Sequence, residues 1–203
     1  MKKILFFAVA LFISVGVSGA QKPQKAKTVC GPYIQCMTET GFTVVWTTDI
    51  DAVAWVEVAP DDGTHFYNRE REKYYDARGH GVHPIGKIHK VEVDGLDPGT
   101  TYRYRIMSKG VTSYNGSGDV EYTRASGTNV YRGQPYRVTT FKNDHDVLKF
   151  DIYNDIHGKD SQFDAILSGA REDLDFVFLN GDMTSNISSE DLIAKMYLGT
   201  AAK

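Results

Sequence analysis

Short runs that alternate apolar and polar residues recur between residues 29 and 141, and no convincing helix lies among them. Successive side chains of a β-strand point to opposite faces, so each run predicts a strand with one buried face. We expect a turn at Asp49-Ile50-Asp51, between the first two strands. Short strands separated by turns indicate an all-β sandwich. The expected strands are residues 42–47, 52–58, 89–93, 102–106 and 136–141.

A proline-glycine turn comes directly before one of these strands, in residues 96–102 (LDPGTTY). Pro98-Gly99 favours a tight turn, and the hydroxyl of Tyr102 can fold back onto the backbone of that turn as a tyrosine corner. With Trp46 as a core aromatic, residues 30–142 resemble a fibronectin type III domain. More narrowly, they resemble the amino-terminal sandwich domain of purple acid phosphatases. Any other seven-stranded sandwich with a turn at this position is the alternative.

The periodicity changes after residues 142–146 (KNDHD), which we interpret as a domain junction. Residues 147–153 and 176–179 are apolar enough to be strands, the second as in a sheet covered on both faces. Ser161 can cap a helix between them. Such a strand-helix-strand unit places its two strands parallel and adjacent or nearly so. A last helix is expected at residues 189–198, after a capping box.

Polar residues with metal-ligand chemistry follow both of these strands. Asp155 and His157 come after the first strand, and Asp182 comes after the second. Ligands of open α/β sheets bind beyond the carboxyl ends of the strands. Asp155 and His157 are two residues apart, so their side chains point the same way on extended backbone. A carboxylate and an imidazole suit zinc, iron or manganese, so the sequence predicts a metal site at Asp155, His157 and Asp182.

These residues resemble the first two motifs of the calcineurin-like metallophosphoesterases, D-x-H and then G-D, here with 23 residues between His157 and Gly181. The resemblance implies that Asp155 and His157 bind a first ion and that Asp182 bridges it to a second. The implied cofactors are two divalent or trivalent ions (Zn, Fe or Mn), and the implied substrate is a phosphate ester attacked by metal-activated hydroxide. Polar residues in surface turns are the alternative reading of the same motifs.

The expected fold class is therefore an all-β sandwich (fibronectin type III-like) at residues 30–142, followed by a partial α/β metallophosphoesterase domain at residues 147–203. Ser185 departs from the purple acid phosphatases, which have a metal-binding tyrosine there and lack a histidine in the D-x-H motif. No histidine and no Asn-His pair follows Asp182 before Lys203. We therefore expect an amino-terminal fragment that is inactive alone, and we assign no residue a catalytic role.

The amino terminus has the pattern of a secretory signal peptide at residues 1–20. Lys2 and Lys3 precede a fourteen-residue apolar run at residues 4–17, and small residues precede a cleavage point after Ala20. The run is shorter than the ~20 residues of a membrane span, so we expect secretion or a periplasmic location, with an uncleaved anchor as the alternative. Residues 21–29 are expected to be a linker.

Cys30 and Cys36 could form a disulfide in such a compartment, if the chain bends at Gly31-Pro32; two free thiols are the alternative. His80 and His83 suit a metal site less well than a solvated loop, because no acidic or cysteine ligand accompanies them at a fixed spacing.

The net charge of −3, without clustered Lys or Arg, gives no reason to expect a nucleic acid partner. A second functional hypothesis is a non-catalytic sandwich that binds carbohydrate or a cell surface. Its candidate residues are Tyr114, Tyr122 and Tyr131, for which structural roles are the alternative.

Overall fold

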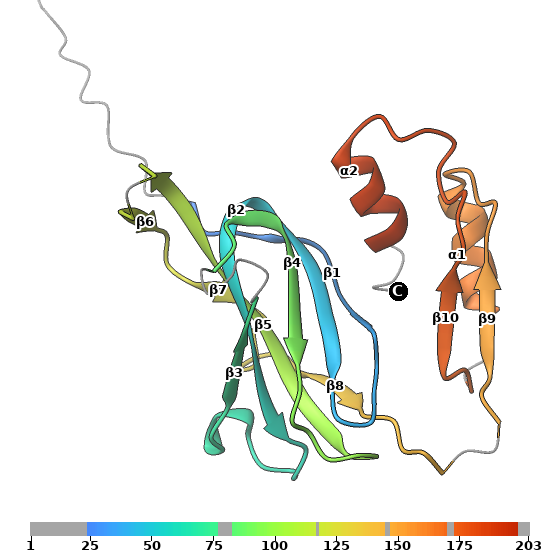
Figure 1. The fold of residues 1–203 in the computed structure, drawn as a ribbon, viewed down its shortest axis with the longest axis horizontal. Helices are drawn as coiled ribbons and strands as arrows, with labels where there is room; N and C mark the ends of the chain where they lie inside the picture. The colour runs from blue at the N-terminus through green and yellow to red at the C-terminus, as the bar shows by residue number, and fades with distance from the viewer. Residues whose placement is uncertain (1–23, 77–82, 117, 145–146, 170–172, 199–203) are drawn as a thin grey trace, which may run out of the picture.

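The computed structural model describes residues 24–76, 83–116, 118–144, 147–169 and 173–198 (Figure 1). Most of these residues lie in β-strands or in the loops between them, with few helices. The expected signal peptide, residues 1–20, lies outside the described residues, as does His80. No helix in the described ranges is both long enough and apolar enough to cross a membrane.

A β-sandwich forms the larger part of the molecule. Its second strand, β2, is the longest and belongs to both layers. The first part of β2, residues 42–48, pairs antiparallel with β1 and β4, and its second part pairs with β3 and β5. β5 then pairs with β6, β7 and β8. The strands are β1 (Thr28–Gln35), β2 (Phe42–Pro60), β3 (Glu72–Tyr75), β4 (Gly86–Val93), β5 (Thr101–Tyr114), β6 (Val120–Tyr122), β7 (Ser126–Gly127) and β8 (Tyr136–Thr139), with a short 3-10 helix η1 (Phe66–Asn68).

The expected turn at Asp49-Ile50-Asp51 is wrong, because β2 runs through these residues as one strand. The register with β4 shifts between Thr47 and Ala52, which lets the strand bend from one layer into the other. Asp49 keeps its partners at this bend: its N–H donates to the Lys27 carbonyl at 3.0 Å, and its carboxylate accepts from the Lys27 N–H at 2.7 Å. Long-range hydrogen bonds therefore override the local turn signal.

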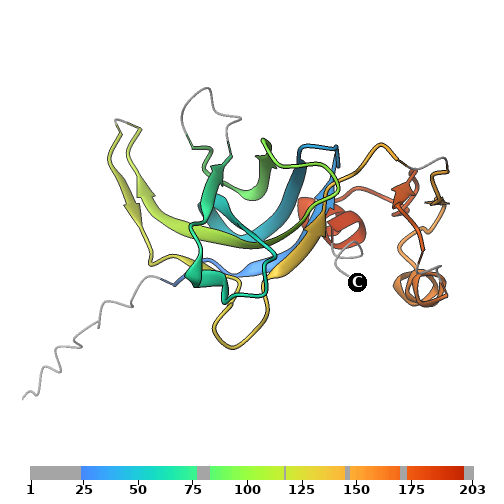
Figure 2. The ribbon, with the colours of Figure 1, turned by 90° about the horizontal axis from the view of Figure 1, so that it is seen from below.

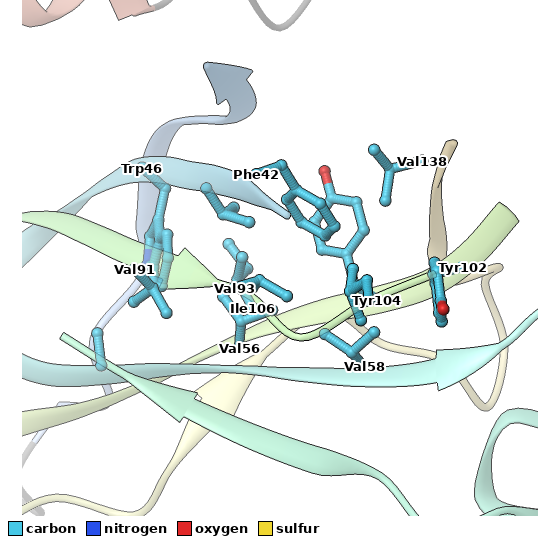
Figure 3. Packing of buried hydrophobic residues seen from close by; sticks show 13 residues of the cluster. Phe42, Trp46, Val56, Val58, Val91, Val93, Tyr102, Tyr104, Ile106 and Val138 are labelled. Atoms are coloured by element: carbon cyan, nitrogen blue, oxygen red, sulfur yellow. The ribbon is translucent and has the colours of Figure 1, made fainter. Parts of the chain in front are cut away.

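Side chains from both parts of β2 meet in one core with those of β4 and β5 (Figure 3). Trp46 is fully buried there, and its indole N–H donates to Ser108 Oγ at 3.0 Å. The tyrosine corner is also confirmed, since the Asp97 N–H donates to the Tyr102 hydroxyl at 2.9 Å. Figure 2 shows the strands curving around this core.

The amino-terminal strand begins at Thr28, inside the expected linker. Its pairing with β2 is irregular between Cys30 and Tyr33, so the chain does bend near Gly31-Pro32. Cys30 and Cys36 are nevertheless both free thiols. His83 lies beside Tyr75, with the ring centroids 4.7 Å apart.

A smaller unit follows the sandwich and has the predicted strand-helix-strand order (Figure 1). Strands β9 (Phe150–Tyr153) and β10 (Phe176–Leu179) are parallel and adjacent, and helix α1 (Asp160–Ser168) connects them. A short helix α2 (Glu190–Ile193) continues into a π-helical turn η2 (Ala194–Leu198) where the last helix was expected.

The strand pair is covered on one face only within the described residues. Phe163 of α1 is buried on that face and packs with Tyr153 and Leu179. On the other face, Phe150 stacks on Phe176, and Phe178 is half exposed. The expectation of a sheet covered on both faces is therefore not met by the part of the chain that the structure describes.

Candidate metal centre

The residues after β9 and β10 keep pairing with each other beyond the ends of the two strands. The Asp155 N–H donates to the Gly181 carbonyl at 3.2 Å, and the His157 N–H donates to the Asp182 carbonyl at 2.9 Å. A third bond joins the Gly158 N–H to the Met183 carbonyl at 2.8 Å. The two predicted motifs are thus held side by side at one edge of the sheet.

Two buried side chains, one from each loop, hold these loops against the helices of the smaller unit. Ile156 and Met183 pack with Phe163 of α1 and with Met196 of η2 in one small core. The neighbouring residues Asp155, His157 and Asp182 are exposed. Apolar residues placed between polar ones therefore turn the candidate ligands towards solvent.

The backbone at these three residues is unusual. Asp155, His157 and Asp182 have φ values of 64°, 53° and 48°, in the left-handed region. Among the described residues that are not glycine, Cys36 alone shares a positive φ. Left-handed backbone costs most residues roughly 1–2 kcal/mol, although Asp and His occur there more often than most.

The side chains of Asp155 and His157 are in direct contact, with 2.5 Å between Asp155 Oδ1 and His157 Nε2. Both remain accessible, with 66% and 45% of the respective side chains exposed. On the other side of the ring, Ser185 Oγ lies 3.4 Å from His157 Nδ1 and donates to the His157 carbonyl at 3.2 Å. Ser185 thus helps to orient the imidazole.

The contact of Ser185 with His157 was not predicted, because the sequence marks Ser185 only as a departure from a tyrosine. A serine after a G-D motif has no distinctive pattern. Only the approach of the two loops places its hydroxyl against His157.

A carboxylate oxygen and an imidazole nitrogen in contact are the donor types of a zinc, iron or manganese site, so Asp155 and His157 fit two ligands of one ion. Within the described ranges, however, no group of three His, Cys, Asp or Glu side chains is arranged to hold a metal. Asp182 approaches the pair through its backbone, and its role as a bridging ligand stays a prediction.

The larger unit, with β1, β4 and half of β2 in one layer and β3, β5 and β8 around the other half, has the arrangement of a fibronectin type III-like sandwich. Its sequence matches a narrower family: residues 33–123 fit the model of the purple acid phosphatase N-terminal domain. This match lies inside the sandwich expected at residues 30–142 and confirms that resemblance for the matched residues.

Solved structures with similarity to the chain include a purple acid phosphatase from yellow lupin (Lupinus luteus) seeds, at 19% identity and a TM-score of 0.48 over 84% of this chain. The chain spans 32% of that protein's length. A human fibronectin type III domain matches at 17% identity and a TM-score of 0.29, over 65% of this chain and 99% of the domain. Scores this low do not establish a shared fold by themselves. No curated protein sequence matches the chain.

Proposed function

We propose that this chain is part of an exported, metal-dependent phosphoesterase that hydrolyses phosphate esters. The match of residues 33–123 to a purple acid phosphatase domain supports a phosphatase relationship. The strand-helix-strand unit with Asp155, His157 and Asp182 at the ends of its strands supports a calcineurin-like metallophosphoesterase domain. Lys2, Lys3 and the apolar run before Ala20 support export.

The observation that carries this proposal is the backbone conformation of the candidate ligands. Three of the four described non-glycine residues with positive φ are Asp155, His157 and Asp182. Sparsely populated backbone conformations cluster at functional sites, where the surrounding structure holds them. Here the hydrogen bonds between the two loops and the buried Ile156 and Met183 hold them.

Asp155 and His157 would hold the first ion, with Zn, Fe or Mn as the candidates, and Asp182 would connect it to a second. When bound, such ions supply hydroxide from water near neutral pH and neutralise charge on the phosphate. The hydroxyl of Ser185 would fix the orientation of His157 by its contacts with the His157 carbonyl and with Nδ1 of the His157 ring. An exposed edge of the sheet gives a phosphate ester access to these groups.

Three side chains are fewer than two ions require, since each ion takes at least four ligands. The residues after Asp182 also include no histidine that could protonate a leaving group. We therefore expect this chain to bind metal measurably but to hydrolyse a phosphate ester slowly.

Titration of the chain with Mn²⁺ or Zn²⁺ by isothermal calorimetry tests the site without relying on turnover. Asp155→Asn should weaken metal binding by about tenfold or more, because it replaces a charged oxygen ligand by a neutral one. Asp51→Asn is the matched control, since Asp51 is an exposed carboxylate of the sandwich. Equal affinities for the parent chain and Asp155→Asn would refute the proposed site. Rapid hydrolysis of a chromogenic phosphomonoester by the chain would refute the expectation that it hydrolyses phosphate esters slowly.

A further inference from the structure

A cavity of about 170 Å³ lies on the sandwich, away from the candidate metal centre, between η1 and the loop that leads into β8. Its walls include Thr64, His65, Arg103, Tyr131, Arg132 and Gln134. Figure 2 shows this loop, between β7 and β8, projecting beside the segment that follows β2. Pockets that enclose drug-sized ligands measure roughly 300–1,000 Å³, so this cavity admits only a ring-sized group.

One wall of the cavity is aromatic. The ring of Tyr131 is 78% exposed and lies 5.0 Å from that of Tyr67 and 5.9 Å from that of His65. The guanidinium groups of Arg71 and Arg105 lie 4.8 and 5.0 Å from the centre of the Tyr67 ring. Tyr67 is therefore partly buried among these groups, while Tyr131 presents a large ring surface to solvent.

The loop that carries Tyr131 is held by its own hydrogen bonds. Asn129 Oδ1 accepts from the N–H groups of Tyr131 at 3.1 Å and Arg132 at 3.2 Å. The Gly133 N–H donates to the Asn129 carbonyl at 3.1 Å, and Val130 is buried against Phe66. The exposed ring is thus presented by an ordered turn, which lowers the entropy lost when it contacts a ligand.

The cavity wall carries two arginines, Arg103 and Arg132, and no carboxylate among the described residues that line it. Arg103 forms ion pairs with Asp61 and Asp62 behind the wall. Arg132 forms no ion pair within the part of the chain that the structure describes, so its guanidinium is available to a ligand. A cavity wall with this free cation favours an anionic ligand.

We propose that this cavity binds an acidic sugar residue, a pyranose that carries a carboxylate. The apolar C–H face of the sugar ring stacks on Tyr131, whose π-face attracts positively polarised hydrogens. The carboxylate pairs with the guanidinium of Arg132. His65 and Gln134 supply hydrogen-bonding groups for the hydroxyls, in the same cavity wall.

A nucleobase fits this cavity less well. Bases are usually held by stacking on aromatic faces along a positively charged groove that follows the phosphate backbone. Here Tyr131 is a single freely exposed ring beside a small cavity with polar walls, which suits a hydroxylated ring.

Binding of oligogalacturonate to the whole chain, measured by calorimetry or by ligand-observed NMR, tests this proposal. Tyr131→Ala and Arg132→Gln should each weaken binding roughly tenfold, through loss of stacking and of the ion pair respectively. Tyr114→Ala should bind like the parent, because Tyr114 is an exposed tyrosine at the end of β5, outside the cavity. Methyl-esterified oligogalacturonate keeps the sugar ring but lacks the charge, so it should bind roughly tenfold more weakly.

The proposal is overturned if the acidic oligosaccharide does not bind, or if Tyr131→Ala binds it as well as the parent does. Equal losses in Tyr131→Ala and Tyr114→Ala would also overturn it, as would equal binding of the methyl ester. Tighter, Tyr131-dependent binding of a single-stranded oligonucleotide would assign the cavity to nucleic acid instead. None of these outcomes depends on metal, so they leave the proposed phosphoesterase site untouched.

Discussion

Replacing Glu57 by glutamine should destabilise the sandwich, because Glu57 is a buried charge shared by two arginines. Its side chain is 4% exposed, and its Oε2 accepts from Arg71 Nε and Arg105 Nε, each at 3.0 Å. Trp55 Nε1 donates to the other oxygen at 3.2 Å. Arg71 directly precedes β3, and Arg105 lies in β5. These two strands pair with β2, so the carboxylate of Glu57 connects β2 to both of its neighbours.

The size of the effect follows from the burial of the partners. Removing one partner of a buried ion pair costs about 3–5 kcal/mol. Water reaches part of Arg71, which is 24% exposed, more easily than Arg105, which is 12% exposed. Glutamine also keeps one accepting oxygen. We therefore expect Glu57→Gln to lower the free energy of unfolding by about 2–3 kcal/mol at pH 7.

Urea unfolding followed by tryptophan fluorescence measures this loss, since Trp46 is buried and Trp55 contacts Glu57. Glu121→Gln is the control, because Glu121 is an exposed carboxylate on the short strand β6. A loss for Glu57→Gln below ~0.5 kcal/mol, the usual range of a surface substitution, would refute the reasoning.

The loss of stability in Glu57→Gln should also depend on pH. Burial raises the pKa of Glu57, but hydrogen bonds from Trp55, Arg71 and Arg105 outweigh it and hold the pKa below 4.5. A carboxyl group with a lowered pKa stabilises the fold above its unfolded pKa and loses that contribution as the pH falls through its folded pKa. The difference between parent and Glu57→Gln should therefore be complete at neutral pH and shrink below pH 4.5. A difference that stays constant into acid would contradict this.

Two further substitutions test the tyrosine corner and the strained loops. Tyr102→Phe should lower the free energy of unfolding by about 1–2 kcal/mol in urea, because the Asp97 N–H loses its acceptor while Asp97 itself stays accessible to water; an unchanged value would show that the hydroxyl is dispensable. His157→Gly should be about 1 kcal/mol more stable than His157→Ala, because both remove the imidazole and only glycine adopts a φ of 53° without strain. Hydrogen exchange of the β9–β10 amides compares the two variants, and equal protection would argue against strain at this residue.

The sequence predicted the main parts of β2, β4, β5 and β8 because their signals are local, whereas β1, β3, β6 and β7 were not among the expected strands. Alternation placed Tyr102, Tyr104 and Ile106 on one face, and all three are buried. It also placed Arg103 on the opposite face without indicating that Arg103 is buried as well. That burial depends on Asp62, which pairs with Arg103 from a segment far away in the chain. Patterning along one strand does not contain such a partner.

The side-by-side placement of the two motif loops was predictable to a similar extent. The motifs after two apolar strands predicted that Asp155, His157 and Asp182 meet at one sheet edge, and backbone hydrogen bonds join their loops there. The sequence did not predict which side chains touch, because these contacts depend on the left-handed backbone and on the buried Ile156 and Met183. The contact of Asp155 with His157, and of Ser185 with the same ring, came from those features.

The amino-acid sequence by itself determined the longer strands on either side of residues 49–51, the turn before Tyr102 and the parallel order of β9 and β10, since periodicity and turn residues act over a few neighbours. The tertiary structure decided whether residues 49–51 turn or continue as a strand, and it brought His65, Tyr67 and Tyr131 together around one cavity. Contacts of this kind join segments that are distant along the chain. Their free energy depends on the packing of the whole sandwich, so no local pattern specifies them.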